Sequence, residues 1–221
     1  MDPVVRHLGR AEYAATWGAM REFTARRDAS TPDELWVVEH PPVFTLGVAA
    51  RAPDVCGPIP VVATDRGGQV TYHGPGQVVV YTLIDLRRLG IFVKELVYRI
   101  EQSAIQALDA LGVAGCRVRG APGVYVAAGH GGERIARETD LAQFSGLAKI
   151  AALGIKVTRG CSYHGVALNV AMDLTPFGWI DPCGYRGLRA IDLATLGVPT
   201  TWDAAAALLV ERLRVHLSPG P

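Results

Sequence analysis

Residues 147–170, LAKIAALGIKVTRGCSYHGVALNV, contain two apolar segments separated by a short turn. Residues 147–157 and residues 163–174 are largely apolar, which predicts two strands. Between them, the residues TRGC at 158–161 include a glycine and predict the turn. This pair decides the fold class, because successive strands joined by a short turn form an antiparallel pair rather than a parallel one.

Four further strands are predicted upstream of this pair. They cover residues 35–46, 61–65, 77–83 and 124–127. Pro41 and Pro42 interrupt the first of them and cannot donate hydrogen bonds to a sheet, so that strand ends there or lies at an edge. Residues 66–76 contain four glycines in eleven residues and predict a loop between the second and third of these strands.

Three helices are predicted, at residues 9–29, 91–111 and 202–217. In the first, Tyr13, Trp17 and Met20 have the i, i+4, i+7 spacing of one helix face. Gly112 is a predicted stop for the second helix. Adjacent runs of strands, with helices at the ends and in the middle, favour an α+β fold with a mixed, mainly antiparallel sheet over a doubly wound parallel sheet.

The composition excludes several classes of protein. The chain has 221 residues, 49% hydrophobic and 19% charged, which predicts one folded domain over residues 1–221 rather than a disordered chain. Its net charge of +1 argues against nucleic acid as a partner. No apolar run reaches about 18 residues, so we expect no membrane-spanning segment. No secretory signal is evident and no CxxC pair occurs, so we expect a cytoplasmic protein.

Cys183 is a candidate nucleophile. It lies in Asp181-Pro182-Cys183-Gly184, where the proline and the glycine predict a tight turn that presents the thiol. The alternative is a small apolar side chain that fills a gap in the core, since free cysteines are often buried. The other cysteines, Cys56, Cys116 and Cys161, have no evident partner and are expected to be structural.

Lys149 is the second candidate. The chain has 22 Lys and Arg residues, of which only three, at 94, 149 and 156, are lysines. On a strand, Lys149 would share its face with Leu147, Ala151 and Leu153, and this apolar setting favours a neutral amine that can exchange a proton. Arginine could not do this, because its guanidinium stays charged. The alternative is a lysine whose ammonium group reaches solvent from a strand end.

The glycine-rich residues 66–76 are a candidate pocket wall, because glycines let the backbone approach a ligand closely. His73 and His164 each precede a glycine, and either could be a general base, a hydrogen-bonding group in a pocket or a structural histidine. The sequence spacing does not link the two. Neither the P-loop nor the dinucleotide-binding glycine motif is present, and no compact cluster of metal ligands occurs.

Taken together, five stretches resemble the lipoyl(octanoyl) transferase family. They are EHPPVFTLG (39–47), RGGQVTYHGPGQ (66–77), AKIAALGIKV (148–157), GCSYHGVALNV (160–170) and DPCGY (181–185). The resemblance implies the catalytic-domain fold of the lipoate and biotin protein ligases. It implies a cytoplasmic acyltransferase of lipoate biosynthesis, which moves an octanoyl group from octanoyl-acyl carrier protein to a specific lysine of a lipoyl domain. The implied acceptors are lipoyl domains of 2-oxoacid dehydrogenases and the glycine cleavage H protein.

The resemblance also assigns roles to residues. Cys183 would carry the octanoyl group as a thioester, and Lys149 would lower the pKa of that thiol. Neither a cofactor nor a metal ion is implied. The implied substrate-binding residues are Arg66, Gly67, Gly68, Gln69, Val70, Thr71, Tyr72, His73, Ala152, Leu153, Gly154, Gly165, Val166 and Ala167, with His164 as possible support.

The acyl chain needs an apolar slot, and small residues could line it. Ala151, Ala152, Gly154, Gly165 and Ala167 are the candidates. A leucine in place of Ala152 or Gly165 is expected to shorten the acyl chain that the protein prefers.

One segment departs from the family pattern. Residues 128–146 are longer and more polar than the usual link before Lys149, and they predict an insertion or a mobile loop. Three alternative functions remain. An ATP-dependent lipoate or biotin ligase would use the same fold without a cysteine nucleophile, a non-catalytic domain would only bind lipoyl or carrier proteins, and a thioester hydrolase would pass the acyl group to water.

Overall fold

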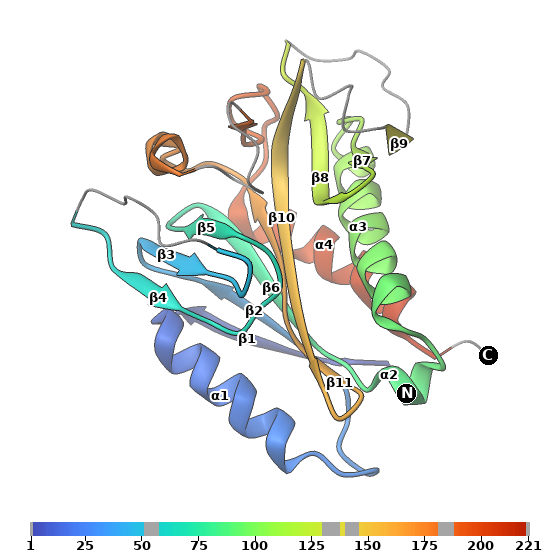
Figure 1. The fold of residues 1–221 in the computed structure, drawn as a ribbon. Coiled ribbons are helices and arrows are strands. Elements are labelled where there is room, and N and C mark those ends of the chain that lie inside the picture. The colour runs from blue at the N-terminus through green and yellow to red at the C-terminus, as the bar shows by residue number, and fades with distance from the viewer. Residues whose placement is uncertain (1, 51–57, 130–137, 140–145, 181–187, 220–221) are drawn as a thin grey trace.

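The protein is described by a computed structural model that covers residues 2–50, 58–129, 138–139, 146–180 and 188–219 (Figure 1). The larger of its two sheets has, in spatial order, β1 (Val4–Arg10), β2 (Glu34–Glu39), β6 (Gln77–Leu83), β11 (Cys161–Asn169), β10 (Leu147–Thr158), β8 (Ala121–Ala127), β7 (Cys116–Val118) and β9 (Glu138–Thr139), and β12 (Arg189–Ala190) pairs with β10. The smaller sheet has β4 (Val61–Ala63), β3 (Val43–Leu46) and β5 (Val70–His73).

Both sheets are mixed. The pairs β2–β6, β6–β11, β11–β10, β10–β8, β8–β7 and β3–β5 are antiparallel, whereas β1–β2, β7–β9, β10–β12 and β3–β4 are parallel. The prediction of an α+β fold with a mixed, mainly antiparallel sheet is therefore confirmed.

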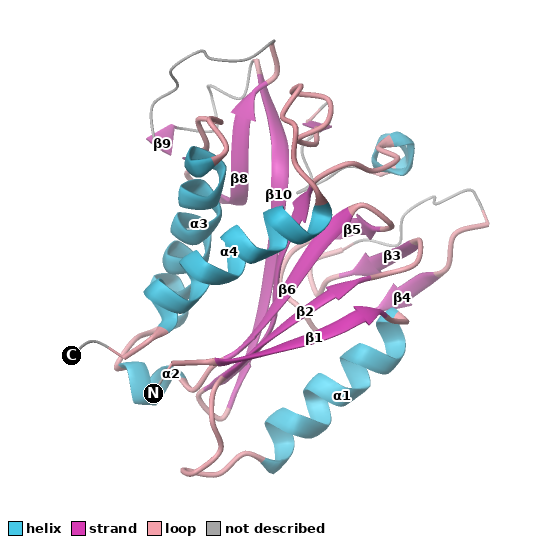
Figure 2. Ribbon diagram, turned by 180° about the vertical axis from the view of Figure 1, so that it is seen from behind, coloured by secondary structure: helices cyan, strands magenta, loops and turns pink. Residues whose placement is uncertain are grey.

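The helices cover both faces of the large sheet. Helix α1 (Tyr13–Arg26) lies on one face, and α3 (Val93–Ala110) and α4 (Trp202–Leu217) pack together on the other (Figures 1 and 2). Two short helices, α2 (Leu86–Leu89) and the 3-10 helix η2 (Thr175–Trp179), follow β6 and β11. None of the helices in the described part of the chain is long and apolar enough to span a membrane.

Two of the three predicted helices are confirmed. Helix α4 has the predicted bounds, and α3 ends before Gly112, whose φ of 76° is the left-handed conformation that favours glycine at a helix end. The first helix was predicted to begin at residue 9 and begins instead at Tyr13, because residues 4–10 form β1. This strand pairs with β2 at the sheet edge and is mostly exposed, so its sequence has no alternation of buried residues.

One predicted strand end is confirmed, and two predictions need correction. Pro41 and Pro42 end β2 as predicted, and the chain then enters the small sheet as β3. The predicted loop at residues 66–76 contains β5, because Val70–His73 pairs with β3. Finally, the strand predicted for 163–174 is β11, which begins at Cys161 and ends at Asn169.

The polar segment 128–146 is described only in part. Within it, Glu138–Thr139 forms β9, which pairs with β7 at the edge of the large sheet. Residues 130–137 and 140–145 lie outside the described residues, so the prediction of an insertion or mobile loop stays a prediction there.

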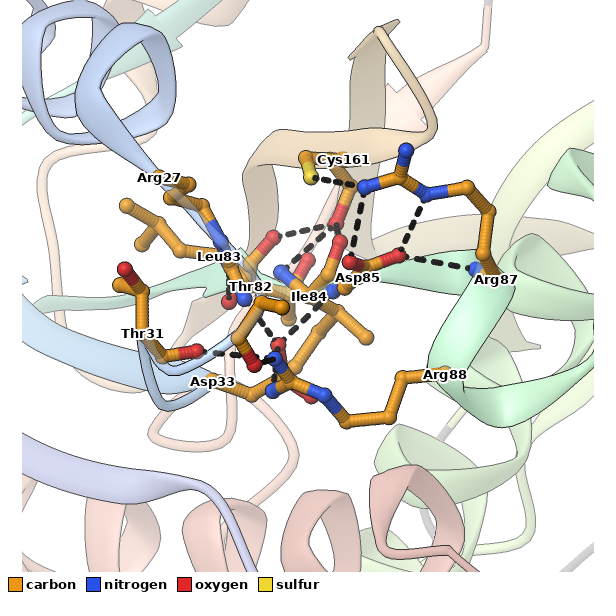
Figure 3. Close-up of polar contacts among 12 residues, drawn as sticks. Arg27, Thr31, Asp33, Thr82, Leu83, Ile84, Asp85, Arg87, Arg88 and Cys161 are labelled. Carbon is orange, nitrogen blue, oxygen red and sulfur yellow. Dashed lines mark hydrogen bonds and ion pairs between the residues drawn. The ribbon is translucent and has the colours of Figure 1, made fainter.

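A buried polar cluster ties together the chain segments at the end of β6 (Figure 3). One carboxylate oxygen of Asp33 pairs with Arg27 and Arg88 and also accepts the backbone N–H of Asp85 at 2.8 Å. Nearby, the hydroxyl of Ser162 donates to the carbonyl of Thr82 at 2.7 Å. The loop before β2, the end of β6 and the start of β11 are thereby held together, which fixes the central strands that carry the site.

Candidate active site

A pocket of about 370 Å³ lies where β10 and β11 meet the glycine-rich segment before β5. Its lining is mostly apolar, and α1, α3, β6 and β8 also contribute to it. The lining residues are Tyr13, Arg66, Gly67, Gly68, Gln69, Val70, Thr71, His73, Val79, Tyr81, Val93, Val97, Gly120, Ala121, Pro122, Lys149, Ala152, Leu153, Gly154, Ile155, His164, Gly165, Val166, Ala167, Asn169, Phe177 and Ala190.

The hairpin of β10 and β11 brings two predicted groups of residues together. In its register Ala152 lies opposite Ala167, Leu153 opposite Val166, and Gly154 opposite Gly165. All six residues of these three pairs line the pocket. A side chain at Gly165 would place its Cβ 2.0 Å from the carbonyl oxygen of Val80 on β6, so glycine is required there by sheet packing.

A β-bulge in β10 directs Lys149 to the pocket. Lys149 is paired with Tyr125 of β8, but the next pair is Ala151 with Val124, so Ile150 is an extra residue. Ile150 and Ala151 both belong to the core on the α3 side, and the alternation then restarts. The prediction that Lys149 shares its face with Ala151 and Leu153 is wrong for this reason, since the bulge lets Lys149 line the pocket together with Ala152.

The Lys149 side chain is 7% exposed, and both its amine and its methylene chain contact neighbouring groups. Its Nζ donates to the carbonyl oxygen of Pro122 at 2.9 Å and lies 5.3 Å from the centre of the Tyr125 ring. Gly123, with φ of 133°, leaves room for this arrangement, because a Cβ there would lie 2.4 Å from Lys149 Cε. The amine is therefore built into the pocket wall rather than extended into solvent.

Arg66 introduces a buried positive charge into the same wall. Its Nε donates to Thr45 Oγ1 at 3.0 Å, and its Nη2 donates to the Thr45 carbonyl at 2.6 Å. The following residue, Gly67, donates its N–H to the carbonyl of Ile155 on β10 at 3.0 Å. The glycine-rich segment is thus fastened to the edge of β10, and its backbone closes one side of the pocket.

The two candidate histidines are neutral hydrogen-bonding groups. Burial, together with the neighbouring His40, lowers the pKa of His73 to about 3, and its Nδ1 lies 2.7 Å from Gln77 Oε1. Burial lowers the pKa of His164 to about 4, although its Nε2 lies 3.0 Å from an Asp65 carboxylate oxygen, which opposes the shift. His164 also has φ of 62°, an unusual backbone conformation for a residue other than glycine.

Aromatic residues complete the polar side of the pocket. Tyr13 from the start of α1 has its hydroxyl 3.5 Å from His164 Nδ1, and Tyr81 has its hydroxyl 2.7 Å from His40 Nε2. Burial raises the pKa of Tyr13 to about 12 and that of Tyr81 well above its ordinary value. Both hydroxyls therefore stay protonated and can donate hydrogen bonds at neutral pH.

The structure gathers most of the predicted binding residues at one place. Thirteen of the fourteen line the pocket, and Lys149 and His164 do so as well. Tyr72 does not, because its ring packs against Phe44 and Phe177 on the side of β5 away from His73. Ala151, a candidate for the acyl slot, also points into the core. Cys183 lies outside the described residues, and Phe177 and Ala190, which precede and follow it in the chain, both line the pocket.

Several lining residues were missed by the sequence analysis. Tyr13 was assigned only to a helix face, and Val93 and Val97 of α3 only to a helix, because nothing in their spacing links them to β10. Pro122 and Gly123 offered a signal in the dipeptide itself, since a glycine within a strand indicates a close backbone approach.

Comparison with known proteins gives one consistent family. A model described as the lipoyl protein ligase A/B catalytic domain matches residues 12–214. A protein from Methylibium petroleiphilum named octanoyltransferase is 59% identical over 97% of this chain and 98% of its own length. Another octanoyltransferase, from Variovorax paradoxus, is 58% identical over 96% of each chain. A crystal structure of lipoate-protein ligase A bound with ATP has a TM-score of 0.72 at 13% identity, covering 98% of this chain and 86% of that one, and shows the shared fold.

Proposed function

The chain belongs to the lipoyl protein ligase A/B catalytic domain family, and we propose that it is an octanoyltransferase of lipoate biosynthesis. The donor is octanoyl-acyl carrier protein, and the acceptor is a specific lysine of a lipoyl domain, as found in 2-oxoacid dehydrogenases and the glycine cleavage H protein. The observation that carries the proposal is an apolar pocket with a buried lysine in its wall, in a chain 59% identical to a protein named octanoyltransferase.

The first step transfers the acyl group to the protein. The Cys183 thiolate attacks the thioester carbonyl of the donor, a new thioester forms on Cys183, and the carrier leaves as a thiolate, which takes a proton from the Lys149 ammonium. One thioester replaces another, so the step is close to balanced in energy and needs no nucleotide. Lys149 as an ammonium favours the Cys183 thiolate, which is the nucleophilic form of a thiol.

The second step passes the acyl group to the acceptor. The neutral amine of the acceptor lysine attacks the Cys183 thioester, an amide forms, and the thiolate of Cys183 leaves. Lys149 as a neutral amine accepts the proton that the acceptor nitrogen loses. Because an amide is more stable than a thioester, this step drives the overall reaction. The two steps form a covalent, ping-pong mechanism.

The pocket wall offers apolar surface for the octanoyl chain. Val79, Leu153, Val166 and the small Ala152 and Ala167 supply apolar surface. At about 0.8 kcal/mol per buried CH₂, the six methylenes of an octanoyl group contribute on the order of 5 kcal/mol.

An assay without nucleotide tests the proposal. The purified protein is mixed with octanoyl-acyl carrier protein and a lipoyl domain, and the lipoyl domain is followed by intact mass. We expect the domain to gain one octanoyl group in the absence of ATP. Strict dependence on ATP with free octanoate would favour a ligase, release of free octanoate would favour a hydrolase, and binding without any acyl product would favour a non-catalytic domain.

A further inference from the structure

A single peptide group lies between two buried ionisable side chains. The carbonyl oxygen of Pro122 accepts from Lys149 Nζ at 2.9 Å, and the N–H of Gly123, in the same peptide unit, donates to Glu101 Oε1 at 2.9 Å. In a trans peptide the C=O and N–H point in opposite directions. Lys149 and Glu101 therefore lie on opposite sides of the same peptide and are connected through it.

Glu101 is an unusual residue for its place on α3. It is 7% exposed and lies on the helix face that also buries Ile100, Ala104 and Leu108. A buried carboxylate is costly unless its oxygens are occupied. Here one oxygen accepts from Gly123 and the other lies 3.2 Å from Nε of Arg117 on β7. Burial raises the pKa of Glu101, while the Gly123 N–H and the charges of Arg117 and Lys149 oppose that rise.

The connecting peptide is closely packed against Lys149 and β10. Gly123 has φ of 133°, and a Cβ on it would lie 2.4 Å from Lys149 Cε and 2.7 Å from the carbonyl oxygen of Ala151. The position of the Pro122–Gly123 peptide thus determines where the amine of Lys149 can lie. Glu101 anchors this peptide from the side opposite to the pocket.

We propose that Glu101 is a positioning residue for Lys149, acting through the Pro122–Gly123 peptide. The carboxylate orients the peptide and polarises it, so that the Pro122 carbonyl becomes a stronger acceptor for the Lys149 ammonium. Within the described residues no ion pair joins Glu101 to Lys149 directly. The acid can therefore favour the ammonium without being its direct counter-ion. This rests on the proposed role of Lys149.

Among the described residues, the ionisable groups around Lys149 that carry this argument come from three elements. They are Glu101 on α3, which interacts with both Lys149 and Arg117 of β7, and Tyr125 on β8, whose ring centre lies 5.3 Å from Lys149 Nζ. Glu101 is the carboxylate among the three described groups, so its removal leaves the positive charge of Arg117 uncompensated. The loss of Glu101 therefore makes the ammonium form of Lys149 less stable relative to the neutral amine.

Glu101→Gln is the direct test. The amide oxygen can still accept from Gly123, but the negative charge is lost. The chain has only three lysines, so ¹³C-lysine labelling gives three side-chain signals, with Lys149 assigned from its absence in Lys149→Arg. We expect the pH midpoint of the Lys149 signal, and the basic limb of the kcat/KM profile for octanoyl transfer, to move down by about half a pH unit or more.

Glu95→Gln is the matched control, because Glu95 lies on the same helix but is exposed and paired with Arg99. The Lys149 midpoint should not move in this variant, nor should the Lys94 and Lys156 midpoints move in Glu101→Gln. Should Glu101→Gln fail to fold, Glu101→Asp is the second variant: its shorter side chain withdraws the carboxylate from the Gly123 N–H, so the Lys149 midpoint should move down in a folded protein.

The outcomes separate the inference from the proposed function. A Lys149 midpoint that is unchanged in folded Glu101→Gln, or in folded Glu101→Asp, overturns the positioning role even if transfer is normal. A shifted midpoint in a protein that transfers no octanoyl group supports the coupling and refutes the function.

Discussion

Replacing Ala152 with leucine should shorten the acyl chain that the pocket accepts. Ala152 on β10 is half-buried, lines the pocket and lies opposite Ala167, so two methyl groups form this part of the wall. Leucine adds three carbons that project into the pocket. If they displace two to three methylenes of the substrate, the loss is about 1.6–2.4 kcal/mol at about 0.8 kcal/mol per CH₂. This corresponds to a fall of about 15- to 50-fold for octanoyl transfer.

The assay is a comparison of kcat/KM for butanoyl, hexanoyl, octanoyl and decanoyl carrier proteins with one lipoyl domain. We expect octanoyl and decanoyl transfer to fall steeply in Ala152→Leu and butanoyl transfer to change little. Ala14→Leu, on the exposed side of α1, is the matched control and should leave the order of preference unchanged. Gly165→Leu is unsuitable for this test, because a side chain there collides with the Val80 carbonyl and would disrupt the sheet.

Equal losses for all four chain lengths would refute the reasoning. Such a result would show that Ala152→Leu disturbs the catalytic groups or the fold instead of the acyl slot. A preserved octanoyl preference at full activity would place the acyl chain elsewhere than along Ala152.

Three further predictions concern charge. Lys149→Arg keeps a positive charge but cannot accept a proton, so transfer should fall severely in a steady-state assay, and near-normal turnover would limit Lys149 to a charge or structural role. Asp33→Asn leaves the buried Arg27 without its counter-ion, so urea unfolding should show a loss of about 3–5 kcal/mol, and a loss under about 1 kcal/mol would contradict the cluster's role. Burial lowers the pKa of His73 to about 3 and of His164 to about 4, so below about pH 6.5 the unfolded chain binds more protons than the folded one. The free energy of unfolding should then fall between pH 7 and pH 5, by up to about 2 kcal/mol per histidine, and equal values at both pH values would contradict this.

Local patterns predicted most of the fold. The helical spacing of α3 and α4 and the apolar runs of β6, β10 and β11 are features of their own segments, and these elements were found at or near the predicted positions, with β11 beginning and ending earlier than predicted. Strand β1 could not be found in this way, because it lies at an edge and buries almost nothing. The short β5 was not predicted, because the glycines around it indicate a loop.

The candidate site was predicted in its residues but not in its geometry. The family resemblance pointed to both strips of the β10–β11 wall, and their cross-strand register is a direct consequence of the turn at 158–161. The bulge at Ile150 could not be foreseen, because it depends on how β8 pairs with β10. The relation of Glu101 to Lys149 is likewise tertiary, since it requires α3, β8 and β10 to meet.

The central claim is that an octanoyl group is held on Cys183 during transfer. Its most direct measurement is intact mass, with peptide mapping, after the protein is mixed with octanoyl-acyl carrier protein and no acceptor. We expect one octanoyl group on Cys183, removed when a lipoyl domain is added, absent in Cys183→Ala and retained in Cys161→Ala. An unmodified Cys183, in a protein that nevertheless transfers octanoyl groups at its normal rate, would contradict the account.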